Sequence, residues 1–197
     1  MQTKVDICNL ALVRLGAKRI NSLDENTPSA KNCSLFFDQI ADIVLREHSW
    51  SFATKNQSLG LIADESVIGW DYLYKFPADC LAPRRIYNAE TVGLTERQEF
   101  KAMQSPATGS VVIAAKISPC YLEYTAKIAD VAMYDSSFVD ALAWRLAAEL
   151  AHPLMGNADA GMKFLQIYER VLINAKATNA QTREEKPRES CSYSDAR

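Results

Sequence analysis

The sequence predicts an α+β protein, a four-helix bundle with a β-rich insertion between the second and third long helices. Stretches at both ends of the chain repeat apolar residues at helical spacing. Residues 51–130 lose that spacing and are rich in turn-forming and aromatic residues. We therefore expect a helical bundle domain (1–50 and 131–182), a β-rich insertion domain (51–130) and a flexible C-terminal arm (183–197).

The first expected helix covers residues 4–15 and is apolar on nearly every side. Such a helix is usually buried or lies in an interface. Thr3 and Asp6 have the spacing of a capping box, and Gly16 follows the last turn, so both ends are defined.

The second expected helix covers residues 27–49. Thr27 is a favourable N-cap, and Pro28 suits the first helical position because its backbone angle is already helical. The face that we expect to be buried consists of Ala30, Cys33, Phe37, Ile40 and Val44, widened by Phe36 and Ile43.

The third expected helix, residues 136–154, has the strongest helical pattern. Asp135 or Ser136 can cap its start, and we expect Pro153 and Gly156 to end it. Its apolar stripe consists of Phe138, Leu142, Leu146 and Leu150, flanked by Ala141, Ala148 and Ala151. A fourth helix is expected over residues 157–181.

The insertion contains one conspicuous strand pattern, which ends at Pro77. Trp70, Tyr72, Tyr74 and Phe76 alternate with other residues, which predicts four aromatic rings on one face of a strand. Such rings can form a core or a subunit contact, or they can stack on bases. Further strands are expected at 85–88, 111–115 and 121–125, and residues 96–103 suit either a strand or a short helix.

The net charge and the cysteine content limit the classes of function that are expected. A formal net charge of −2 does not indicate a broad cationic surface for binding phosphates. The five cysteines are scattered and include no C-x-x-C pair, and His48 and His152 are isolated in the sequence. We therefore expect no disulfide framework, no metal and no cofactor. No segment is apolar enough to span a membrane, and the N-terminal residues do not resemble a signal peptide, so we expect a cytoplasmic protein.

Cys80 is the only thiol in a conspicuous motif, FPADCL at 76–81, and His152 is its possible base. No glycine-rich oxyanion turn accompanies it. The alternative interpretation is that Asp79 caps a turn and Cys80 packs inward as a small apolar group. Arg145 and Glu149 are one helical turn apart, which is typical of a modest surface ion pair or an interface contact. We therefore expect no catalytic residues, and phosphate-binding loops are absent from the sequence.

Several segments together resemble the head-to-tail adaptor family of short-tailed bacteriophages, also called tail tubular protein A. They occur in the expected order over nearly the whole chain: ICNLALVRLG at 7–16, INSLDE at 20–25, WSFA at 50–53, FPADCL at 76–81, FVDALA at 138–143 and LAAELA at 146–151.

The resemblance implies a virion structural protein at the head–tail junction, assembled in the host cytoplasm. Copies would form a ring, commonly of twelve, that binds the portal protein on one side and the tail nozzle, with tail fibre proteins, on the other. The ring would extend the channel through which DNA passes, without sequence-specific binding. The resemblance implies no catalytic, cofactor-binding or metal-binding residues.

Two alternatives stay open at this point. One is a different phage head or tail completion protein, such as a connector, and the other is a small cysteine hydrolase that uses Cys80. The arm at 183–197 has almost no apolar residue besides Tyr193. It is either a solvated tail without a role or a segment that binds the portal or a neighbouring subunit during assembly.

Overall fold

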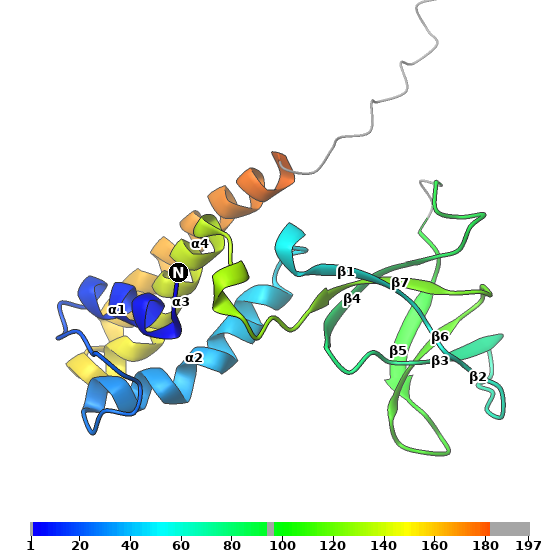
Figure 1. Ribbon diagram of the computed structural model, residues 1–197, viewed down its shortest axis with the longest axis horizontal. Helices are drawn as coiled ribbons and strands as arrows, with labels where there is room; N and C mark the ends of the chain where they lie inside the picture. The colour runs from blue at the N-terminus through cyan, green and yellow to red at the C-terminus, as the bar shows by residue number, and fades with distance from the viewer. Residues whose placement is uncertain (1, 94–96, 182–197) are drawn as a thin grey trace, which may run out of the picture.

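The computed structural model describes residues 2–93 and 97–181, and Figure 1 shows helices gathered at one end and strands at the other. The helices are α1 (Lys4–Arg14), α2 (Pro28–Arg46), α3 (Ser136–Met155) and α4 (Ala158–Gln181). None of the helices in these residues combines the length and apolar character of a membrane span.

Seven strands lie between α2 and α3 in the described residues, and they form two antiparallel sheets. They are β1 (Thr54–Ser58), β2 (Leu61–Ile62), β3 (Tyr72–Lys75), β4 (Cys80–Tyr87), β5 (Phe100–Gln104), β6 (Val111–Ala115) and β7 (Tyr121–Ala126). The first sheet has the order β1-β7-β4, and the second has the order β2-β3-β6-β5. The strand expected at 111–115 is confirmed, and the ambiguous stretch near residue 100 is a strand.

The expected four-helix bundle with a β-rich insertion is wrong, although the four helices themselves exist. The strands separate the helices into two pairs, α3 packs against each of the other three helices, and α4 packs chiefly on α3. With 11 residues, α1 is only about 16 Å long and cannot cover a full face of α3. The helical core is instead completed by side chains of the strand region, including Leu81 and Ile128.

The division of the chain into domains at residues 51 and 130 stays a prediction. The helical core receives side chains from both ends of the strand region, so the two parts share packing. The expected C-terminal arm at 183–197 lies outside the described residues.

α3 is the central helix, as the sequence predicts. Its apolar stripe is buried, with Phe138, Leu142, Leu146 and Leu150 fully inaccessible. Asp135 is the N-cap, and its side chain accepts from the backbone N–H of Ser137. The expectation for Pro153 is wrong, because the helix continues to Met155 and Gly156 ends it in the left-handed conformation that glycine favours.

The predicted starts of α1 and α2 are confirmed. Thr3 and Asp6 form a complete capping box at α1, in which each side chain bonds the backbone of the other residue. Thr27 caps α2 by accepting from the backbone N–H of Ala30, and Pro28 occupies the first turn. These caps satisfy backbone donors that have no partner within the helix.

The aromatic strand differs from its prediction, because both of its faces are covered. Tyr74 is buried in a core between the two sheets, against which Tyr72 and Phe76 pack. Trp70 instead packs beside the buried Leu73 on the other face. The Tyr74 hydroxyl donates to the backbone oxygen of Ile117 at 2.8 Å, so this ring is a core side chain and not a platform for bases.

The junction between helices and sheets is built around Trp50. This buried ring donates Nε1–H to the carbonyl of Val44 at 3.0 Å and meets Phe138 edge-on at 5.1 Å. Asn179 of α4 joins the same junction, accepting from the backbone N–H of Ser51 at 2.9 Å and donating to the carbonyl of Ser49. The end of α4 is thereby tied to the entry into β1.

Candidate assembly interface

Cys80 and His152 are not brought together. Cys80 begins β4, whereas His152 is exposed in the last turn of α3, and the end of α3 lies away from the sheets in Figure 1. Burial, followed by the nearby Asp79 carboxylate, raises the pKa of the Cys80 thiol to about 11. Because the thiolate is the nucleophile, a raised pKa opposes the chemistry that a cysteine hydrolase requires.

Asp79 has a different role from the predicted turn cap. Its carboxylate accepts from Lys55 Nζ at 2.7 Å and from the hydroxyl of Tyr124 at 2.9 Å. The hydrogen bond from Lys55 is the largest cause of a lowered pKa for Asp79. The side chain therefore fastens the turn before β4 to the strands β1 and β7.

The predicted pair of Arg145 and Glu149 is an ion pair with a separation of 2.8 Å between Nη1 and Oε1. It lines a hollow between α3 and α4 together with His152 and Met162. His48 lies elsewhere, with its Nε2 atom 2.9 Å from the side-chain nitrogen of Asn179. Among residues 2–93 and 97–181, no three His, Cys, Asp or Glu side chains form a group that could hold a metal ion.

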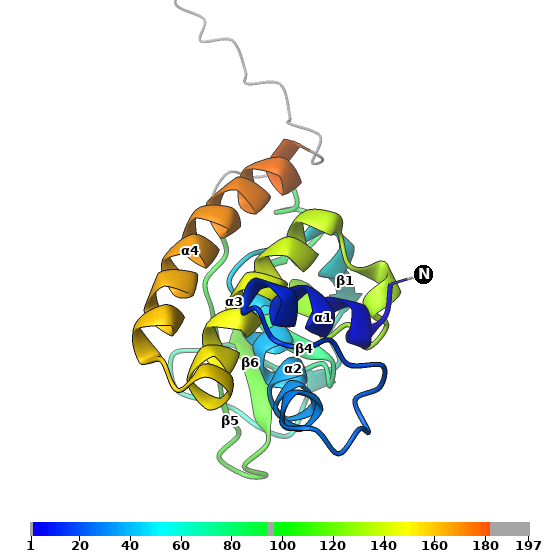
Figure 2. The ribbon, with the colours of Figure 1, turned by 90° about the vertical axis from the view of Figure 1, so that its left-hand side faces the viewer.

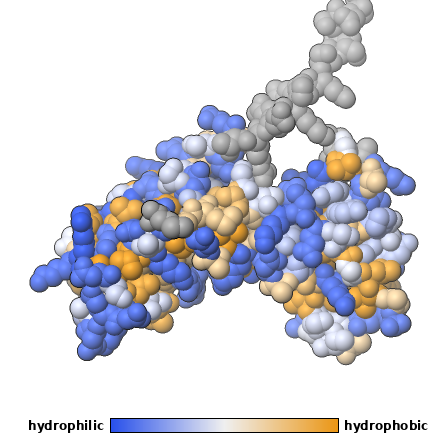
Figure 3. Space-filling view, in the orientation of Figure 1, coloured by the Kyte–Doolittle hydropathy of each residue, from blue (hydrophilic) through white to orange (hydrophobic). Residues whose placement is uncertain are grey.

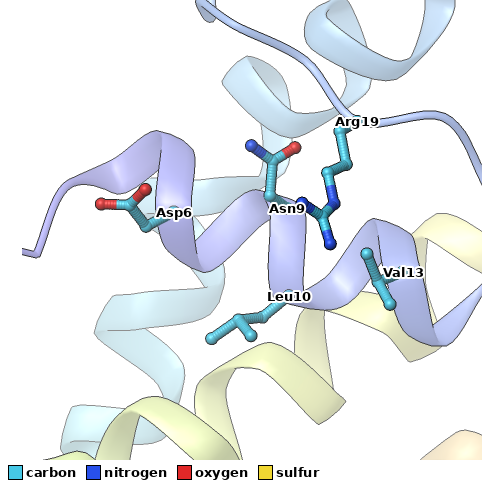
Figure 4. A pocket seen from close by; sticks show the side chains of 5 residues that line it. All are labelled: Asp6, Asn9, Leu10, Val13 and Arg19. Atoms are coloured by element: carbon cyan, nitrogen blue, oxygen red, sulfur yellow. The ribbon is translucent and has the colours of Figure 1, made fainter.

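A groove on α1 is the strongest candidate for a functional surface. Its lining residues are Asp6, Asn9, Leu10, Val13 and Arg19, and Figure 4 shows Arg19 reaching from the following loop toward α1. We call these five residues the α1 groove. Leu10 is 42% exposed and Val13 is 50% exposed, so two large aliphatic side chains face solvent on a helix that also contributes to the core. Figure 3 shows hydrophobic side chains reaching the surface of the helical part among hydrophilic ones.

The wall of the α1 groove is fixed by Asn9. Its side-chain amide donates to the carbonyl of Ile20 and accepts from the N–H of the same residue, both at 2.9 Å. Since Ile20 is itself buried, the loop after α1 is held against the helix at this point. Arg19 directly precedes Ile20 in the sequence, so the loop that Asn9 holds in place also places Arg19 in the lining of the groove.

Arg14 fixes the orientation of α1 against α3. Its guanidinium lies 4.1 Å from the centre of the Trp144 ring and donates to the carbonyl of Asp140 at 3.0 Å. Arg14 also forms an ion pair with the Asp140 carboxylate. α1 is thus anchored on α3, and Leu10 and Val13 are held in place on its outer face.

The α1 groove suits protein–protein contact better than chemistry. The lining combines two aliphatic side chains with one carboxylate and one guanidinium, and interfaces commonly combine apolar contacts with charged groups at their edge. The five described residues that line the groove provide no thiol, hydroxyl or imidazole that could act as a nucleophile. It can therefore accept an apolar side chain from a partner and pair with charges beside it.

The sequence predicted that α1 is buried or lies in an interface, but it did not identify which residues are exposed. The usable signal was the spacing of Asp6, Asn9, Leu10 and Val13. These positions follow the i, i+3, i+4, i+7 pattern and so share one helix face. Two polar residues on that stripe mark it as the outer face.

Comparison with known proteins leaves the family open. The chain matches no protein-family model, and no curated protein matches it significantly.

Proposed function

We propose that this chain is a virion structural protein, a head-to-tail adaptor that forms a ring between the portal and the tail nozzle. The ring extends the DNA channel, and DNA passes through it without sequence-specific binding. The observation that carries the proposal is the α1 groove, because it exposes Leu10 and Val13 on a helix that is otherwise part of the core. Exposed apolar side chains on an anchored helix are typical of surfaces that become buried on assembly.

The resemblance of the sequence segments to the adaptor family is the reason for proposing a ring at the head–tail junction. ICNLALVRLG at 7–16, which resembles the adaptor family, is the segment that contains Leu10 and Val13. A net charge of −2 also suits a channel protein that does not hold DNA by its phosphates. The sequence resemblance and the net charge are both consistent with a protein that works by assembly rather than by catalysis.

Co-sedimentation with purified portal rings tests the proposal. We expect the wild-type chain to sediment with the portal in a fixed stoichiometry, and we expect Leu10→Asp to reduce the bound fraction. The matched control is Leu35→Asp, which places the same charge on an exposed face of α2 outside the α1 groove. No binding of the wild-type chain to portal rings of the matching phage would contradict the proposal.

A further inference from the structure

We propose that the α1 groove binds the α3–α4 corner of a second copy of this chain. We define the α3–α4 corner as Met155, Asp159, Met162 and Lys163. The inference rests on the proposed ring and names the surfaces that join neighbouring subunits within it.

The α3–α4 corner presents a second exposed apolar pair. Met155 is 47% exposed at the end of α3, and Met162 is 62% exposed on the first turns of α4. Asp159 and Lys163 are also exposed, and Met162 and Lys163 lie three and four residues after Asp159, so both are neighbours of Asp159 on the helix surface. Methionine is a flexible apolar side chain that adapts to the shape of a partner groove.

The α3–α4 corner is closely packed and capped. A side chain at Gly161 would place its Cβ only 3.0 Å from the backbone oxygen of Ala148, so the two helices approach closely there. Gly156 joins the helices with a left-handed turn, and Asn157 accepts from the backbone N–H of Ala160 at 3.1 Å.

The two surfaces are complementary in charge as well as in polarity. The α1 groove has Asp6 and Arg19 beside its aliphatic pair, and the corner has Asp159 and Lys163 beside its methionines. Arg19, Asp159 and Lys163 take part in none of the ion pairs formed within the described part of the chain. Docking can pair Arg19 with Asp159 and Asp6 with Lys163.

The positions of the two surfaces favour a second copy as the occupant. In Figure 2, α1 crosses in front of α3, and the turn between α3 and α4 lies to its lower left, so the two surfaces are separate parts of one subunit. A closed ring needs a head-to-tail contact between two different surfaces of each subunit. The α1 groove and the α3–α4 corner supply such a pair as the centre of a contact, which typically buries on the order of 1,600 Å² in total.

Site-specific photo-crosslinking tests this contact. Leu10→p-benzoylphenylalanine in the full-length chain, irradiated as assembled rings, should give a chain-to-chain adduct. The adduct should map to the tryptic peptide of residues 146–163, which contains the corner up to Lys163. The same photoreactive residue at Leu35 is the matched control and should not label this peptide. Adducts on any other part of the chain, adducts only to the portal, or no adduct would overturn the inference.

Charge reversal provides a second measurement. Arg19→Glu and Asp159→Arg should each weaken assembly roughly two- to five-fold, because rim ion pairs contribute modestly. Combined in one chain, the two reversals should restore assembly to near the wild-type level. If the double variant weakens assembly by the product of the two single fold-changes, Arg19 and Asp159 do not pair. Rings that bind the portal while crosslinking elsewhere would reject this contact and leave the proposed function intact.

Discussion

Nη2 of Arg84 lies 2.7 Å from the backbone oxygen of Arg46, and this hydrogen bond joins β4 to the C-terminus of α2. The same nitrogen donates to the carbonyl of His48 at 2.9 Å, and Nε donates to the hydroxyl of Thr125 at 2.9 Å. The last carbonyls of a helix have no partner within it and carry partial negative charge. Arg84 satisfies them and at the same time fixes the sheets against the helical part.

Replacing Arg84 should loosen this junction. Arg84→Ala removes hydrogen bonds from a charged donor, so we expect the free energy of unfolding to fall by about 1.5–3 kcal/mol. The matched control is Arg85→Ala, the adjacent residue on β4, whose side chain donates to the carbonyls of Thr91 and Val92 and lies over the Tyr87 ring, so it bonds none of the described residues of the helical part. Chemical denaturation of both variants measures the difference. Equal losses for the two variants would show that the Arg84 contacts contribute little.

The centre of α3 should be intolerant of both cavities and charge. Leu146 is fully buried, so Leu146→Ala should lower the free energy of unfolding by about 2–5 kcal/mol. Leu146→Asp buries an unpaired carboxylate and should prevent folding, since total stability is only about 5–15 kcal/mol. Leu35→Ala, on an exposed face of α2, should change stability by less than about 0.5 kcal/mol. Thermal unfolding provides the measurement, and an unchanged midpoint for Leu146→Asp would contradict the assigned core.

Asp79 should make stability depend on pH on the acid side. Its pKa is lowered in the folded protein, chiefly by the hydrogen bond from Lys55, and the unfolded value is about 3.9. The unfolded state therefore takes up a proton first as the pH falls, so the stabilisation is complete above about pH 4 and is lost as the pH falls through the folded pKa. The stability difference between wild type and Asp79→Asn should shrink as the pH is lowered below about 4.

The control for Asp79 uses its cationic partner. In a Lys55→Gln background the main cause of the lowered pKa is absent, so the Asp79→Asn substitution should show a weaker dependence on pH. Urea denaturation of the four variants at a series of pH values gives this comparison. A dependence that is unchanged by Lys55→Gln would show that another group sets the pKa of Asp79.

Cys80 should react slowly with alkylating reagents. With a thiol pKa of about 11, it is almost entirely protonated at pH 7, whereas a free cysteine has a pKa of about 8.5. We expect iodoacetamide to label Cys80 at least roughly a hundred-fold more slowly than glutathione in the same buffer. Peptide mapping over time follows Cys80 separately from the other four cysteines. Labelling at the rate of glutathione would revive the hydrolase alternative.

The helices were predictable from the sequence because their caps and periods are local. Thr3 with Asp6 and Thr27 with Pro28 identify helix starts without reference to the rest of the chain. The arrangement of the helices was not predictable, because it depends on side chains such as Leu81 that arrive from the strand region. The alternating pattern predicted Trp70 on the same face as Tyr74, and this was wrong. Trp70 precedes β3, in the adjacent turn, and its ring packs on the other face of the sheet from Tyr74.

The candidate interface was predictable only in part. The sequence showed that its helix is apolar on nearly every side. The two hydrogen bonds between the Asn9 side chain and the Ile20 backbone, however, join residues eleven positions apart and follow no local pattern. The same holds for Arg14, whose partners on α3 are more than a hundred residues away. Contacts of that range fix which side of α1 faces outward, and hence the exposure of Leu10 and Val13.

Electron microscopy of the wild-type chain mixed with purified portal rings tests whether this chain forms an adaptor ring. We expect class averages in which a second ring with an open centre is stacked coaxially on the portal. The Leu10→Asp variant should reduce the fraction of portals that carry this ring, and Leu35→Asp should not. Portal rings that remain bare at saturating concentrations of a correctly folded wild-type chain would show that this chain is not a head-to-tail adaptor.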